Sequence, residues 1–328
     1  MRLELRADGL AVEGNVALST LDAVLRGVGQ VMLQNNTWAG LLFAAGAFAA
    51  SPAAGASLLA GATISTLVAV LLGADRGDVR AGLYGFNGAL VGIALAVFLR
   101  MDAFFWALLV GGAGGATVVA AAVSQALRAH ALPALTAPFV LVTWAILAGH
   151  TGLSHLRESD AMPVAHLAAA AAPGAVALST LAEGTARGLA QVFVQDHLAS
   201  AALVLAGLLL ASRRAAAAAV LGALGGTAVG AALGAGEAAL RTGLFGYNSA
   251  LTAVALVALL PSSRWAALYA LFAVAAAAVA SAATSALLAP LGLPGLTAAF
   301  VGVTWGALWA APGFGRVVPR GAAPRGGG

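Results

Sequence analysis

The chain repeats itself at a fixed offset of 161 positions, and this duplication limits the folds that it can adopt. GLYGFNGALVG at 82–92 returns as GLFGYNSALTA at 243–253, and LPALTAPFVLVTW at 132–144 returns as LPGLTAAFVGVTW at 293–305. Because the same offset joins distant strings, the match reflects an internal duplication. We therefore expect two copies of one structural unit.

Composition places both copies in a membrane. The 328 residues are 61% hydrophobic and 9% charged, with a mean hydropathy of +0.97, which is more apolar surface than a soluble chain of this length buries. The net charge of +4 comes from scattered arginines, so we expect no nucleic-acid partner. Cysteine is absent, and the glycine-rich runs lack the Lys and Ser/Thr of a phosphate loop. We expect no metal, no cofactor and no enzymatic activity.

The lengths of the apolar runs predict ten membrane-spanning helices, five in each copy. They lie near 38–52, 55–73, 84–99, 102–128 and 136–150, and near 199–212, 215–234, 248–262, 264–289 and 297–311. Each copy also opens with a shorter segment with polar ends, near 16–34 and 176–195, which predicts a re-entrant half-helix. The expected divisions are a first repeat at 1–150, a linker at 151–175, a second repeat at 176–311 and a disordered basic tail at 312–328.

An odd number of spans per copy means that the second copy enters the membrane in the opposite orientation. The expected fold is an all-α membrane protein, with ten transmembrane helices plus two re-entrant pore half-helices in an inverted repeat. With both termini cytoplasmic, eleven of the sixteen arginines fall on the inner side and three on the outer side. We expect a multi-pass protein of the cell (inner) membrane, whose first spans act as their own insertion signal because the start lacks the apolar core of a signal peptide.

Polar residues recur at matched positions inside the apolar segments. They are Gln30 with Gln191, Asn87 with Asn248, and Thr136 with Thr297. One interpretation is structural, because a membrane Thr often bonds its own helix and Asn or Gln often ties helices together. The other is a solute path, since Gln oxygens, Thr hydroxyls and the last carbonyls of two half-helices are mostly acceptors. Such a path would suit a neutral solute rich in N–H donors.

Apolar residues flank these acceptors. Leu33 and Val194 lie three positions after each glutamine, while Leu90 and Leu251 lie in the GLYGFNGAL-type motif. They are either ordinary membrane packing or the walls of a thin slot that admits a planar molecule.

Three strings in order, RGVGQVMLQNN, LYGFNGALVG and LPALTAPF, each repeated in weaker form, resemble the urea transporter family of bacteria and animals. The resemblance covers about 15–311. It implies a homotrimer in the lipid bilayer with one urea pore per subunit, and passive channel-type transport of urea along a ladder of oxygens between apolar walls. The substrate-binding residues that we expect are Gln30, Gln191, Thr136, Thr297, Leu33, Val194, Leu90 and Leu251.

The chain departs from this family at a few positions. Where Leu33 stands, the family often has a phenylalanine, so the slot is expected to be wider or less selective. The second copy has Asp196 and His197 in place of Asn35 and Asn36. They favour a cap on the half-helix, although His titrates near neutrality and a pH gate is the alternative.

Two other functions stay open. The first is a channel of the same fold for another small neutral solute, such as a short amide or ammonia, although the histidines lie at predicted loops or helix ends. The second is a proton-coupled transporter or membrane enzyme, which needs an ionisable group deep in a span. The candidates for that role are Glu183, Asp196 and His197.

Overall fold

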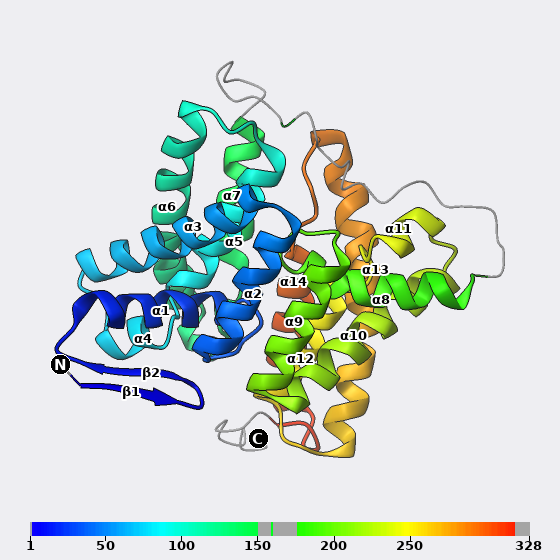
Figure 1. Cartoon of the computed structure of the whole chain (residues 1–328). Coiled ribbons are helices and arrows are strands. Elements are labelled where there is room, and N and C mark those ends of the chain that lie inside the picture. The colour runs from blue at the N-terminus through cyan, green and yellow to red at the C-terminus, as the bar shows by residue number, and fades with distance from the viewer. Residues whose placement is uncertain (1, 150–158, 160–175, 319–328) are drawn as a thin grey trace. The chain divides into compact units, whose positions relative to one another are not determined.

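The computed structural model describes residues 2–149, 159 and 176–318, and within them most residues are helical (Figure 1). The elements of the first half are β1 (Arg2–Arg6), β2 (Gly9–Glu13), α1 (Val16–Gln30), α2 (Thr37–Ala50), α3 (Pro52–Leu71), α4 (Arg76–Arg80), α5 (Gly85–Phe98), α6 (Ala103–Leu127), η1 (Arg128–His130) and α7 (Ala137–Gly149). Those of the second half are α8 (Leu178–Gln191), α9 (Leu198–Ala211), α10 (Arg213–Ala232), α11 (Glu237–Arg241), α12 (Tyr247–Leu259), α13 (Arg264–Leu288), η3 (Ala289–Leu291), α14 (Ala298–Ala310) and η4 (Ala311–Gly313).

Each of the ten apolar segments predicted as a span contains one α-helix, with ends within three residues of the prediction. Local caps fix several of these ends. The Asn36 side chain accepts a hydrogen bond from Ala39 N at 2.9 Å before α2, and Ser51 caps α3 ahead of Pro52 in the first helical position.

Four of the described helices are long and apolar enough to cross a bilayer, namely α3, α6 with its 3₁₀ extension, α10 and α13. The helices α2, α5, α7, α9 and α12 are also apolar but have 13 or 14 residues. At about 1.5 Å per residue these reach roughly 20 Å, less than the ~30 Å hydrocarbon core, so they need adjoining turns to cross it. The chain is a membrane protein with several apolar helices, and the count of ten spans remains a prediction.

The described part departs from an all-α fold at its start. β1 and β2 form an antiparallel hairpin in which Arg6 pairs with Gly9 and Leu5 with Leu10, around a two-residue turn at Ala7 and Asp8. The short helices α4 and α11 were also not predicted. The predicted linker 151–175 lies outside the described residues except for 159, as does the predicted tail from 319 onward; Val317, in the described part of the tail, is buried.

The chain divides into two compact units, and each unit contains a segment that belongs to the other sequence repeat. The first comprises Met1–Gln125, Thr136–Val164 and Phe193–Ser212, and the second comprises Ala126–Leu135, Ala165–Val192 and Arg213–Gly328. The α9 helix of the second repeat therefore packs in the first unit, and the segment before α7 packs in the second.

Within the first unit, α2 and its repeat counterpart α9 make reciprocal contacts. A Cβ on Gly46 would lie 3.3 Å from Ser200 O, and a Cβ on Gly207 would lie 3.1 Å from Ala39 O. Gly207 and Ser200 are 161 positions after Gly46 and Ala39. Because the end of each helix meets the start of the other, α2 and α9 run antiparallel, and the two contacts are equivalent as in a two-fold interface.

Glycines let α1 and α8 each lie against the backbone of a neighbouring helix. A Cβ on Gly27 of α1 would lie 3.0 Å from Gly85 Cα, and one on Gly188 of α8 would lie 3.2 Å from Gly246 Cα. This approach places the end of α1 beside α5 and the end of α8 beside α12, in the same way in both repeats.

Candidate functional site

The helices α1 and α8, which were predicted as half-helices, are each followed by a strained turn at the same repeat position. The helices α1 and α8 end at Gln30 and Gln191, and three residues later Leu33 and Val194 adopt left-handed backbone with φ of 57° and 55°. This conformation costs a non-glycine residue about 1–2 kcal/mol, and it is still less favourable for a β-branched valine. Strain kept at matched positions marks these turns as candidate functional elements.

The surrounding backbone orients the two glutamine amides. Gln30 Nε2 donates to Ala81 O at 2.9 Å, and Gln191 Nε2 donates to Thr242 O at 3.0 Å. An amide oxygen turned toward these carbonyls would face another acceptor, so each carbonyl fixes the nitrogen and directs Oε1 to the other side. Both glutamines are half-buried. The ends of α1 and α8 therefore each present an oriented acceptor oxygen.

The two predicted threonines follow a second pair of strained residues. Leu135 and Leu296 have φ of 50° and 46°, directly before Thr136 and Thr297. Each threonine is 3% exposed and lies immediately before α7 or α14. These threonines are therefore fixed at the start of a short helix in both repeats.

The third polar pair, Asn87 and Asn248, is structural. Asn87 Oδ1 accepts from Phe139 N, and Asn248 Oδ1 accepts from Phe300 N, both at 3.0 Å. Phe139 and Phe300 lie in the first turns of α7 and α14, whose N–H groups have no partner inside the helix. Each asparagine thus caps a helix from the neighbouring helix and holds the threonine that starts it.

The apolar candidates differ in burial. Leu90 and Leu251 are 0% exposed on α5 and α12, whereas Leu33 and Val194 are half-buried. The eight predicted residues do not lie in one compact unit. The first unit contains Gln30, Leu33, Leu90, Thr136 and Val194, and the second contains Gln191, Leu251 and Thr297.

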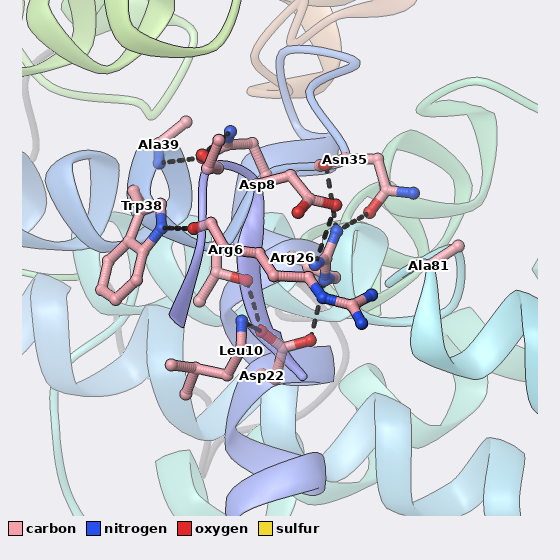
Figure 2. A network of polar contacts seen from close by, with 12 residues as sticks. Arg6, Asp8, Leu10, Asp22, Arg26, Asn35, Trp38, Ala39 and Ala81 are labelled. Carbon is pink, nitrogen blue, oxygen red and sulfur yellow. Dashed lines mark hydrogen bonds and ion pairs between the residues drawn. The ribbon is translucent and has the colours of Figure 1, made fainter. Parts of the chain in front are cut away.

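A polar cluster on and beside α1 was not predicted. The hairpin network, as we call it, consists of Asp8, Asp22, Arg26, Asn35 and Thr37. Figure 2 shows Arg26 at its centre, with Asp22, Asp8 and Asn35 around it. The Asp8–Gly9 dipeptide between alternating apolar residues, and the four-residue spacing of Asp22 and Arg26, are the sequence signals that could have indicated it.

In the second half, the residue equivalent to Asp22 is an acid with a different partner. Glu183, 161 positions after Asp22, accepts from Arg241 Nη1 at 2.9 Å, and Arg241 also pairs with Glu237. A hydrogen bond from Thr180, followed by the contacts with Arg241, lowers the pKa of Glu237. Glu183 is therefore engaged in an ion pair that joins α8 to α11. In the part of the chain that is described, no group of three or more His, Asp or Glu side chains has a metal-binding arrangement.

The sequence was compared with family models and with known proteins, and both comparisons give urea transporters. The family model described as "Urea transporter" matches residues 21–312. The chain is similar to "Urea transporter 1" of Rattus norvegicus, with 31% identity over 255 residues, and to that of Ovis aries, with 30% identity over 253 residues. Both alignments cover 76% of this chain and 66% of the relative, so the match spans slightly under two thirds of these relatives.

Proposed function

The chain belongs to the urea transporter family, and from this premise we propose that it transports urea passively through a pore in each protomer. The observation that carries the proposal is the pair of oriented amide oxygens at the ends of α1 and α8. Urea is planar and neutral and offers only N–H donors and one carbonyl, so acceptors fixed at both half-helices fit it. The family consists of transporters, in agreement with the expectation that the chain is not an enzyme.

We assign the solute path to the eight residues predicted from the sequence. Gln30, Gln191, Thr136 and Thr297 would supply oxygens to the solute. Leu90, Leu251, Leu33 and Val194 would supply apolar walls.

The inverted repeat is part of the same proposal. The antiparallel run of α2 and α9 supports opposite orientations of the repeats at 1–150 and 176–311, with five spans each. Both termini would then face the cytoplasm. The chain has no cysteine, so single cysteines can report the topology. With Arg76→Cys and Arg100→Cys, an impermeant thiol reagent added outside intact cells should label only position 100; labelling of position 76 contradicts the topology.

A homotrimer, with one path per subunit, completes the proposal. It rests on the family resemblance, and exposed apolar side chains on α13 such as Phe272, at 73% exposure, are available for lipid or a neighbouring protomer. Mass measurement of the detergent-solubilised protein after subtraction of the detergent tests it, and a monomeric mass would contradict it.

Stopped-flow light scattering of proteoliposomes after a urea jump tests the transport itself. We expect rapid urea entry that the double variant Thr136→Val, Thr297→Val reduces at least tenfold, because the isosteric valines remove two acceptors. The matched control is Thr63→Val, since the Thr63 hydroxyl bonds Leu59 O of its own helix at 2.7 Å. Absence of urea entry in the wild type refutes the proposal, whereas entry of acetamide or ammonia alone would assign another neutral solute.

A further inference from the structure

The turn that follows α1 is held in its strained shape from two sides. On one side, Gln34 N–H donates to Gly29 O at 3.0 Å and Leu33 N–H donates to Gln30 O at 2.9 Å. These backbone bonds close the turn locally. The Gln30 amide is held separately by Ala81 O at 2.9 Å. The backbone bonds do not connect the turn to the rest of the unit, so the position of the turn and of Leu33 depends on what holds the far side.

Arg26 holds that far side. It lies one helical turn before Gln30, and its Nη1 donates to Asn35 at 2.8 Å (Oδ1) and 3.2 Å (backbone O). Its Nε donates to Asp22 Oδ2 at 2.8 Å, and Nη2 donates to Asp8 Oδ2 at 3.3 Å. Only a guanidinium reaches three separate acceptors in this way. Arg26 therefore bridges both ends of the strained turn.

Asp22 anchors this arginine to three elements. It is 8% exposed, and its Oδ1 accepts from the Thr37 hydroxyl at 2.5 Å and from Leu10 N at 2.8 Å. A buried ion pair is stable only when its other hydrogen-bonding positions are filled, and these two donors fill them. The carboxylate thereby connects α1 to the start of α2 and to strand β2.

The hairpin covers the ion pair. Thr37 N donates to Asp8 O at 3.0 Å, and Trp38 Nε1 donates to Arg6 O at 2.9 Å (Figure 2). Gly9, with φ of 153°, leaves no room for a side chain, because a Cβ would collide with Thr37, Arg26 and Asp22. The backbone at Gly9 thus packs directly against Asp22 and Arg26, whose side chains are each 11% exposed, while the Asp8 side chain stays 59% exposed.

The second repeat offers a natural comparison. There the acid Glu183 pairs with Arg241 at 2.9 Å, and both side chains are 37% exposed. Among the described residues, the only strands are β1 and β2. The half-helix α8 thus has no described equivalent of the hairpin, although Val194 has the same strained backbone as Leu33.

We infer that Asp22 and Arg26 are positioning residues for the solute path, and that the β1–β2 hairpin, seated on them through Asp8 and Gly9, sets solute selectivity at the first half-helix. The inference rests on the proposed urea transport. The network fixes the turn that carries Gln30 and Leu33. Loosening it changes both how fast urea passes and which larger amides pass with it.

The test compares urea and methylurea fluxes in proteoliposomes, together with the melting temperature of each variant. We expect Arg26→Gln to lower urea flux about tenfold and to move the urea-to-methylurea ratio about threefold toward methylurea, as small displacements of positioned groups do. Arg26→Lys should restore part of the urea flux and part of the urea-to-methylurea ratio, because the lysine ammonium replaces some of the N–H donors of the guanidinium. Gly9→Ala should change the ratio in the same direction with the network side chains intact. The matched control, Glu183→Gln, should leave the ratio unchanged.

The outcomes separate the two proposals. A wild-type protein without urea flux refutes the transport function itself. A conducting wild type, with Arg26→Gln and Gly9→Ala both at the wild-type ratio, overturns the inference. Lower flux and lower melting temperature at an unchanged ratio also overturn it, since that is a purely structural effect. If Arg26→Gln does not fold, the ratio in Gly9→Ala decides.

Discussion

Replacing Asn248 with alanine tests whether the asparagines act as caps between helices. The carboxamide of Asn248 accepts from Phe300 N at 3.0 Å and donates to Ser281 Oγ at 2.9 Å and Leu296 O at 3.3 Å. Ser281 Oγ and Leu296 O each keep another hydrogen bond, so the substitution leaves only the Phe300 N–H without a partner. One buried donor left unpaired costs about 1–3 kcal/mol, and we expect about 2 kcal/mol.

Asn87→Ala should cost the same within about 0.5 kcal/mol, because its bond to Phe139 N has the same 3.0 Å length. Unfolding in mixed detergent, followed by tryptophan fluorescence, measures both values. Ser281→Ala is the control, since it keeps the Phe300 cap, and we expect well under 1 kcal/mol. An unfolding free energy for Asn248→Ala equal to that of the wild type would show that the N–H finds another partner, and the capping role would be wrong. If Asn248→Ala does lower the unfolding free energy, it should also lower urea flux, because the cap holds the start of α14 at Thr297.

Further predictions concern size, packing and pH. Leu33→Phe should raise the urea-to-methylurea flux ratio, because a ring narrows the path; an unchanged ratio in the liposome assay would remove Leu33 from the path. Gly85→Ala should lower the unfolding free energy by about 2 kcal/mol, since its Cβ would lie 3.1 Å from Gly27 Cα; unfolding in mixed detergent measures this, and no loss would mean that the helices separate at little cost. Because the pKa of Glu237 is lowered from 4.5 in the folded state, its contribution to stability is complete above 4.5 and is lost as the pH falls through the lowered value. Thr180→Val should therefore reduce the fall in melting temperature between about pH 5 and pH 3, and an unchanged fall would show that the Thr180 bond is not responsible.

The helix extents could be predicted because long apolar runs and side-chain caps such as Asn36 and Ser51 define them locally. The ends of α1 and α8 could not be predicted. The predicted segments ran to 34 and 195, yet α1 and α8 end at Gln30 and Gln191. The turn that stops α1 has a leucine where a glycine usually marks a helix end, so the sequence carries no stop signal there.

The β1–β2 hairpin and the hairpin network could not be predicted for a different reason. The Asp8–Gly9 dipeptide was visible in the sequence, but the charged start was interpreted only as lacking the apolar core of a signal peptide. The partners of Arg26 come from a strand turn, from its own helix and from the following loop. Pattern within one helix indicates Asp22 as a partner, whereas Asn35 and Asp8 become neighbours only through the fold. The assignment of the eight predicted path residues remains a prediction for the flux experiments.

The exchange of segments between the two compact units has a consequence for how the chain is made. The α9 helix packs on α2, with the Ser200 hydroxyl donating to Gly46 O at 2.6 Å, so the first unit stays incomplete until residue 212 has left the ribosome. Trp305 Nε1 donates to Pro133 O at 2.8 Å across 172 residues, and this contact forms only after residue 305 has left the ribosome. Segments of the first repeat thus complete their packing only after parts of the second repeat have been synthesised. A polypeptide with only the first repeat would therefore need a second polypeptide to provide the helix that packs on α2.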